Sequence, residues 1–121
     1  MAAFQAFGQQ RVDALLVGCD LFFFSRRGFV IEQAERFRLA GIYEWRQYAE
    51  AGGLMSYGTS ITESFRHAGD YVARILRGEN LADLPVLQAT RFEMVINLKA
   101  AQALGIEVPA NLSARADDII E

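Results

Sequence analysis

Three short segments of this chain combine aromatic side chains with a few polar groups. They are Asp20–Ser25 (DLFFFS), Glu44–Arg46 (EWR) and Ser56–Thr59 (SYGT). Apolar and aromatic surface with a small number of placed polar groups is typical of a pocket that binds a small molecule. We therefore predict a ligand-binding site. Its candidate residues are Asp20, Phe22, Phe23, Phe24, Glu44, Trp45, Ser56, Tyr57 and Gly58.

Several of these residues also have a structural interpretation. Any single ring of Phe22–Phe24 fits the core, since burying a phenylalanine is worth about 1.5–3 kcal/mol. Three consecutive rings cannot all face one side, so at least one is expected near the loop surface. Asp20 suits a turn cap as well as a ligand contact. Arg26 and Arg27 fit a solvated first helical turn better than an anion clamp.

The sequence contains no residue pattern for catalysis, metal binding or nucleotide binding. The single histidine, His67, has no serine or cysteine at a spacing that suggests a triad, and no second histidine or cysteine nearby for a metal. The glycines match neither GxxxxGK[ST] nor GxGxxG. We expect no catalytic residue, no metal and no cofactor. A net charge of -3 with no basic face also argues against a nucleic-acid partner.

The elements that must position these segments follow from hydrophobic period and capping signals. Helices are expected at 2–10, 25–40, 46–51, 60–77 and 97–104, and strands at 14–19, 42–45, 54–57 and 92–97, followed by a last helical turn and a tail after Asn111. The apolar run ALLVGC at 14–19 favours a central parallel strand covered on both faces. Ser25 is expected to cap the second helix, Ser60 with Glu63 the fourth, and Asn97 the fifth.

This alternation predicts an α/β fold: a mainly parallel sheet with flanking helices in three α-β-α layers and right-handed crossovers. The carboxyl ends of parallel strands meet at one edge of the sheet, which is where open α/β proteins bind ligands. The three segments are therefore expected to gather there. The polar turn expected at Ser56–Thr59 would join the third strand to the helix at 60–77, on which Asp70 and Arg74 are spaced to pair.

The 121 residues are expected to form one domain, 1–121. The N-terminus lacks the basic region and apolar run of a secretory signal, and no stretch reaches the length of a membrane span. As written, the chain is expected to remain in the cytoplasm.

Long parts of the sequence resemble a known family. GCDLFFFSRR, GIYEWRQYAEAGGLMSYGTSITESFRHAGDYVARILRG and ADLPVLQATRFEMVINLKAAQALGIEVP are similar to the C-terminal half of ABC transporter solute-binding proteins of the tryptophan and tyrosine uptake type. The most specific parts are GGLMSYG at Gly52–Gly58 and the passage from Ala82 to Lys99. The resemblance covers essentially the whole chain.

The resemblance implies a Rossmann-like lobe of the periplasmic binding protein type I kind. Two such lobes would close on a small organic solute, with Ser56–Gly58 near the chain crossing between lobes and Asp20–Phe24 at the cleft edge. It also implies ABC permease subunits as partners, a periplasmic location for the complete protein, and no enzymatic activity. Relative to the family, this sequence is expected to lack the first lobe and a signal segment.

Without that lobe, the helix at 60–77 is expected to expose an apolar stripe, and exposed stripes seek another surface. We expect residues 60–121 to pack on a first lobe or on another copy, with a homodimer through the 60–77 helix as one outcome. Two other functions remain open at this stage. One is a flavodoxin-like enzyme that uses Asp20 or Glu44 in acid/base catalysis, and the other is a ligand-free signalling or interaction domain.

Overall fold

A computed structural model describes residues 2–121 of the chain. The helices and strands follow one another in the order expected for βα units. They are α1 (Ala2–Gln10), β1 (Ala14–Val17), α2 (Leu21–Ser25), α3 (Arg27–Arg36), β2 (Ala40–Tyr43), α4 (Arg46–Glu50), β3 (Met55–Thr59), α5 (Ile61–Leu76), a 3-10 turn (Leu81–Asp83), β4 (Phe92–Asn97), α6 (Leu98–Leu104), α7 (Ala110–Ser113) and β5 (Asp118–Ile120).

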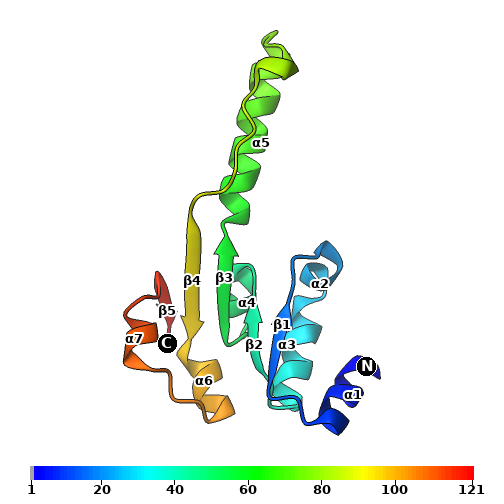
Figure 1. The fold of residues 1–121 in the computed structure, drawn as a ribbon, viewed down its shortest axis with the longest axis vertical. Helices are drawn as coiled ribbons and strands as arrows, with labels where there is room; N and C mark the ends of the chain where they lie inside the picture. Colours follow the sequence, from blue (N-terminus) through cyan, green and yellow to red (C-terminus); the bar gives the residue numbers. More distant parts are fainter. Residues whose placement is uncertain (1) are drawn as a thin grey trace.

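The five strands form one sheet in the order β1-β2-β3-β4-β5 (Figure 1). The pairs β1–β2, β2–β3 and β4–β5 are parallel, and only β3–β4 is antiparallel. The predicted α/β fold with a mainly parallel sheet and flanking helices is confirmed. The antiparallel pair arises because the chain leaves β3 through α5 and runs back alongside that helix before entering β4 (Figure 1). The sequence did not predict β5, which lies in the expected tail.

The largest cluster of buried side chains lies between the sheet and the helices α3 and α4, which pack against each other and against β2. Tyr43 of β2 stacks on Tyr48 of α4 with ring centroids 4.6 Å apart. The cluster consists of Val17, Val30, Ile31, Tyr43, Trp45 and Tyr48. Burial of these side chains is the main attraction that holds the helices on this face of the sheet.

Burial raises the pKa of the Tyr43 hydroxyl from 10.0 to about 12, and its side chain is only 2 % exposed. The folded chain therefore favours the neutral phenol. The neutral Tyr43 therefore contributes to the free energy of unfolding in full below pH 10. This contribution is lost as the pH rises toward 12, at about 1.4 kcal/mol per pH unit. In the described chain the hydroxyl makes no hydrogen bond. We expect Tyr43→Phe to change the free energy of unfolding by less than about 1 kcal/mol at pH 8.

Between pH 10 and 11.5, the Tyr43→Phe variant is expected to lose stability more slowly than the parent chain. Urea denaturation at pH 8, 10 and 11 measures both slopes. Equal slopes in the two proteins would show that the Tyr43 hydroxyl does not carry this pH dependence.

The strand β1 corrects one expectation. It was predicted to be central and covered on both faces, but among residues 2–121 no strand pairs with its outer edge. Val17 points into the core, whereas Leu16, on the opposite face, is 77 % exposed. A continuous apolar run indicates that both faces of a strand are apolar. It does not indicate how many strands pair with it, so it cannot distinguish a central strand from an edge strand.

The helix caps are confirmed at two positions and corrected at one. The Ser60 side chain accepts a hydrogen bond from the Glu63 amide at 3.3 Å, and Asn97 accepts one from the Ala100 amide at 3.0 Å. Ser25, however, does not start a helix: its hydroxyl donates to the Phe22 carbonyl at 2.8 Å, within α2. The helix predicted at 25–40 is the shorter α3 (Arg27–Arg36), and a separate helix, α2 (Leu21–Ser25), forms in the segment before it, which was expected to be a loop.

The helix α5 projects beyond the end of the sheet, and residues 77–91 run back beside it (Figure 1). The Tyr71 hydroxyl donates a hydrogen bond to the Pro85 carbonyl and so joins the two parts of this arm. Arg74 pairs with Glu79 at 2.7 Å and not with Asp70, as the spacing had suggested. No residue of α5 is buried. The described part of the chain contains no helix long and apolar enough to cross a membrane.

Candidate functional site

The carboxyl ends of β1, β2 and β3 lie at the same edge of the sheet, because these three strands run parallel. The loops that follow β1 and β2 carry two of the predicted segments to this edge. We call the resulting surface the rim. It consists of Asp20, Phe22, Phe23, Phe24, Glu44, Trp45 and Gly58.

Asp20 begins the rim and fixes the start of α2. Its carboxylate accepts hydrogen bonds from the amides of Phe22 at 2.7 Å and Phe23 at 3.2 Å. This N-cap is of the kind worth about 1 kcal/mol. Asp20 itself is exposed, so a carboxylate oxygen remains open to solvent while the cap holds α2 in place.

The three phenylalanines divide between surface and core. Phe22 and Phe23 are 59 % and 44 % exposed and lie edge to face with centroids 5.8 Å apart. The guanidinium of Arg26 lies over the Phe22 ring at 4.8 Å. Phe24 instead packs inward. The sequence argument that all three rings cannot face one side is therefore confirmed, and two of the rings are available to a ligand.

Phe24 and Trp45 join the rim to the core. Their rings meet edge to face at 4.7 Å, and Phe24 also lies 5.9 Å from Tyr48. Trp45 is only 8 % exposed. Its main contribution is therefore to hold the β2–α4 loop in position, and it offers a ligand little free surface.

Glu44 and Gly58 bring the second and third segments into contact. A Cβ atom placed on Gly58 would lie 2.2 Å from the Glu44 carbonyl oxygen, so the two backbones approach more closely than any side chain permits. Glycine is required here for that close approach. The Glu44 carboxylate also faces Cys19, the last residue before Asp20, and so connects all three segments.

A hydrogen bond with Glu44, followed by partial burial, raises the pKa of the Cys19 thiol above 9.0. The thiol is exposed, and its thiolate is the species that reacts with alkylating agents. We expect slow alkylation by iodoacetamide at pH 8 and a severalfold faster reaction in Glu44→Gln. Asp20→Asn is the matched control, because Asp20 is the weakest of the contributors to this shift. Equal rates in the parent chain and Glu44→Gln would show that Glu44 does not hold the thiol neutral.

Ser56 and Tyr57 do not lie at the rim. The polar turn expected at Ser56–Thr59 is part of β3, which runs to Thr59, so both residues lie within the sheet. Neighbouring residues of a strand point to opposite faces. Ser56 is 1 % exposed, with its hydroxyl unpartnered in the described chain. Tyr57 is half exposed on the other face, where it stacks on Phe92 at 5.7 Å.

Arg46 is a residue whose role the sequence did not reveal. Its guanidinium pairs with Glu50 at 2.8 Å, with Asp118 at 2.6 Å and with Glu93. The hydrogen bonds with Glu50 and Asp118 raise the pKa of Arg46, which stays charged. These pairs connect α4 to β4 and β5. Two of the partners are far along the chain, so local spacing gave no signal for them.

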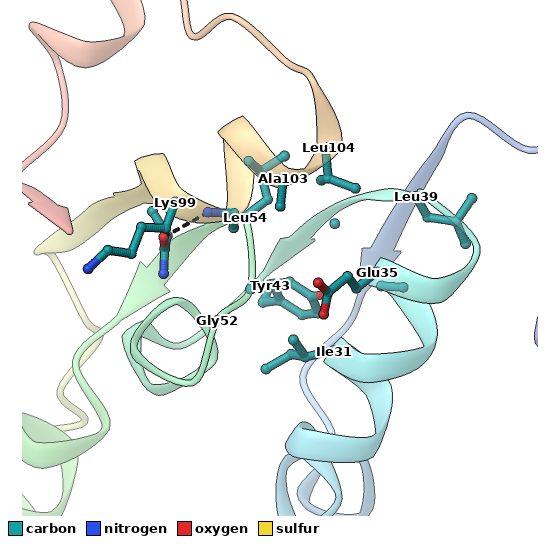
Figure 2. A pocket seen from close by; sticks show the side chains of 14 residues that line it. Ile31, Glu35, Leu39, Tyr43, Gly52, Leu54, Lys99, Ala103 and Leu104 are labelled. Atoms are coloured by element: carbon teal, nitrogen blue, oxygen red, sulfur yellow. Dashed lines mark hydrogen bonds between the residues drawn. The ribbon is translucent and has the colours of Figure 1, made fainter. Parts of the chain in front are cut away.

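A separate cavity lies at the opposite end of the sheet from the rim. It has a volume of about 330 Å³ between α3, the turn before β3, and α6 (Figure 2). Ile31, Leu39 and Leu54 give it apolar walls, and Glu35 and Lys99 add charges. No predicted site residue lies here. Among residues 2–121 no cluster of three or more His, Cys, Asp or Glu side chains is arranged to hold a metal ion.

Comparison with known proteins gives a consistent family match. A family model described as ABC transporter substrate binding protein matches residues 3–120. A conserved domain protein from Vibrio cholerae is 30 % identical with a TM-score of 0.88, and the match covers 98 % of this chain and 40 % of that one. An ABC domain from Streptococcus pneumonia, solved in complex with L-Trp, is 26 % identical with a TM-score of 0.87 and coverages of 98 % and 41 %.

A substrate-binding protein from Clostridium difficile, solved in a ligand-free, open form, has the same fold at 22 % identity, with a TM-score of 0.62 and coverages of 99 % and 39 %. No curated protein sequence is similar enough to this chain to count as a match. The chain thus spans about 40 % of the length of the solved proteins it resembles.

Proposed function

This chain belongs to the ABC transporter substrate-binding protein family, and on that premise we propose that it is a lobe that holds a small organic solute at its rim. The observation that carries the proposal is the rim itself. Three parallel strands bring exposed aromatic rings and two carboxylates to one edge of a lobe whose fold matches that of an L-Trp-binding relative. This edge is where open α/β sheets bind ligands.

The chemistry of the rim favours a solute with an apolar or aromatic body and a cationic group, such as an amino acid. Phe22 and Phe23 offer ring faces and edges, on which aromatic groups stack. Asp20 and Glu44 offer carboxylate oxygens to an ammonium group. Asp20 keeps one carboxylate oxygen in the α2 cap and, being exposed, leaves the other to a ligand.

The partners of the complete protein follow from the same proposal. A first lobe closes on the rim, ABC permease subunits receive the solute, and the complete protein works outside the cytoplasm. The rim of this chain is one half of such a site. If the complete site binds at about micromolar affinity, roughly -8 kcal/mol, half of its contacts leave about -4 kcal/mol, or millimolar affinity. The entropy cost of association is not halved, so the chain alone binds more weakly still.

Isothermal titration of the 121-residue chain with L-Trp and a panel of other amino acids tests this proposal. We expect millimolar or weaker binding of at least one of them, weakened severalfold further by Phe22→Ala and by Phe23→Ala. Leu81→Ala, which changes a 69 % exposed apolar residue on the arm, is the control and should bind like the parent chain. Binding that neither rim variant changes, or no binding of any amino acid, would contradict the proposal.

A further inference from the structure

The cavity between α3, the turn before β3, and α6 lies at the opposite end of the sheet from the rim (Figure 2). Its volume of about 330 Å³ falls within the roughly 300–1,000 Å³ of small-molecule pockets. The walls are mainly apolar and include Ile31, Leu39, Leu54 and Leu104. The first lobe proposed above closes on the rim, so in that arrangement it does not cover this end of the sheet.

Hydrogen bonds between distant residues hold the walls of the cavity in place. Asn97, which is 5 % exposed, donates to the Ala49 carbonyl at 2.9 Å and accepts from the Ala100 amide at 3.0 Å. It thereby joins the end of α4 to the start of α6. Arg38, in the turn after α3, donates to the Leu104 carbonyl at 3.2 Å, at the other end of α6. The cavity is therefore formed by the chain itself, as is usual for ligand pockets.

The Tyr43 hydroxyl is a buried polar group of the cavity wall without a partner. Its side chain is 2 % exposed, and the hydroxyl makes no hydrogen bond within residues 2–121. A Cβ atom placed on Gly41 would collide with this hydroxyl, and one on Gly53 would lie 2.7 Å from the ring. Both glycines also line the cavity, so the ring lies on bare backbone with its hydroxyl at the cavity wall (Figure 2). A ligand that bonds to this hydroxyl removes the cost of burying it unpaired.

The charges around the cavity favour a neutral ligand. Glu35 and Lys99 are exposed and opposite in sign, and the Lys99 ammonium already donates to the Glu121 carbonyl at 2.7 Å. Burial raises the pKa of Tyr43 to about 12, so its hydroxyl stays neutral at pH 7. An ion without a partner is costly to bury. The amino acids proposed for the rim carry two charges and therefore fit this lining poorly.

We propose that this cavity binds a neutral, mainly apolar phenol or alcohol whose hydroxyl group hydrogen-bonds to the Tyr43 hydroxyl. Each hydroxyl can both donate and accept, so the pair needs no further partner. At about 30 Å³ for each water-sized group, the cavity takes a ligand of roughly ten non-hydrogen atoms. Because the cavity and the rim lie at opposite ends of the sheet, this ligand does not compete with a solute at the rim.

A nuclear magnetic resonance titration of the ¹⁵N-labelled chain with 4-propylphenol, a probe of this size, tests the proposal. The amide signals of residues 41, 52–54 and 100–104 should move progressively, with millimolar or tighter binding. Propylbenzene, which lacks the hydroxyl, is the matched compound and should bind more weakly. Tyr43→Phe should weaken 4-propylphenol about two- to tenfold, the worth of one hydrogen bond, and leave propylbenzene unchanged.

Two further variants show where the compounds bind. Ala103 is exposed on α6 and lines the cavity, so Ala103→Trp should keep the fold, as far-UV circular dichroism checks, and fill the space. It should weaken both compounds at least about tenfold, because the pocket volume is lost. Phe22→Ala, on the rim, should change neither affinity, so this proposal and the rim proposal fail independently. No shifts up to the solubility of 4-propylphenol, shifts at the rim or arm in place of the cavity, or binding that Tyr43→Phe and Ala103→Trp both leave unchanged would overturn the proposal.

Discussion

Replacing Trp45 with alanine is expected to lower the free energy of unfolding by about 3–5 kcal/mol, as is usual when a large buried aromatic is truncated. Trp45 is 8 % exposed, belongs to the main hydrophobic cluster and holds Phe24 edge to face at 4.7 Å. Its loss leaves a cavity beneath the rim and frees the β2–α4 loop. Urea denaturation followed by far-UV circular dichroism measures the change.

Phe22→Ala is the matched control, because it removes an aromatic ring that is 59 % exposed on the same rim. It should change the free energy of unfolding by less than about 0.5 kcal/mol, the usual range for a surface substitution. If the two variants lost similar stability, the interpretation that Trp45 supports the fold while Phe22 forms exposed surface would be wrong.

Gly58→Ala is expected to destabilise the chain by about 1–3 kcal/mol, the usual cost of forcing extra volume into a packed site. The new Cβ would lie 2.2 Å from the Glu44 carbonyl oxygen and 3.0 Å from the Glu44 carbonyl carbon. These are backbone atoms, so no side chain can rotate away and the two segments must separate. We expect solute binding at the rim to fall at least tenfold as well. Thermal unfolding and isothermal titration measure the two effects.

Gly28→Ala provides the comparison for the glycine substitution. Gly28 lies in α3, and a Cβ atom there meets nothing within 4 Å. Because alanine favours a helix over glycine, this variant should gain about 0.5–1 kcal/mol. If Gly58→Ala matched the parent chain in stability and binding, the close approach of the second and third segments would play no part in the site.

Much of the fold was predictable because its signals are local. Strand and helix alternation along the chain predicts parallel β1, β2 and β3, and parallel strands bring their carboxyl ends together. Ser60 and Asn97 were recognisable as caps, since a cap depends on residues three positions away. The division among Phe22–Phe24 followed from the steric argument that three consecutive rings cannot share one side.

The features that sequence reasoning missed depend on contacts between distant residues or on small shifts of register. The edge position of β1 depends on what else joins the sheet. The short β5 is recognisable only through its pairing with β4. The strand β3 ends at Thr59, two residues after its predicted end. Ser56 and Tyr57 therefore lie within the sheet, on opposite faces, and not in a turn at the rim. Asp20 was predicted as either a cap or a ligand contact, and only the structure showed that it makes the cap.

The rim and the arm are separate surfaces of this chain. If the rim binds the proposed solute, substitutions at Phe22 or Phe23 should lower solute affinity, whereas substitutions of the exposed Phe65 or Val72 on the arm should leave it unchanged.

The most direct test of the solute-binding proposal is a nuclear magnetic resonance titration of the ¹⁵N-labelled chain with L-Trp. If the rim binds the solute, the amide signals of residues 20–24, 44–45 and 58 move progressively with L-Trp concentration. The signals of the arm and of the cavity between α3 and α6 stay in place. Shifts confined to that cavity, or no shifts at millimolar L-Trp and at similar concentrations of other amino acids, would contradict the account.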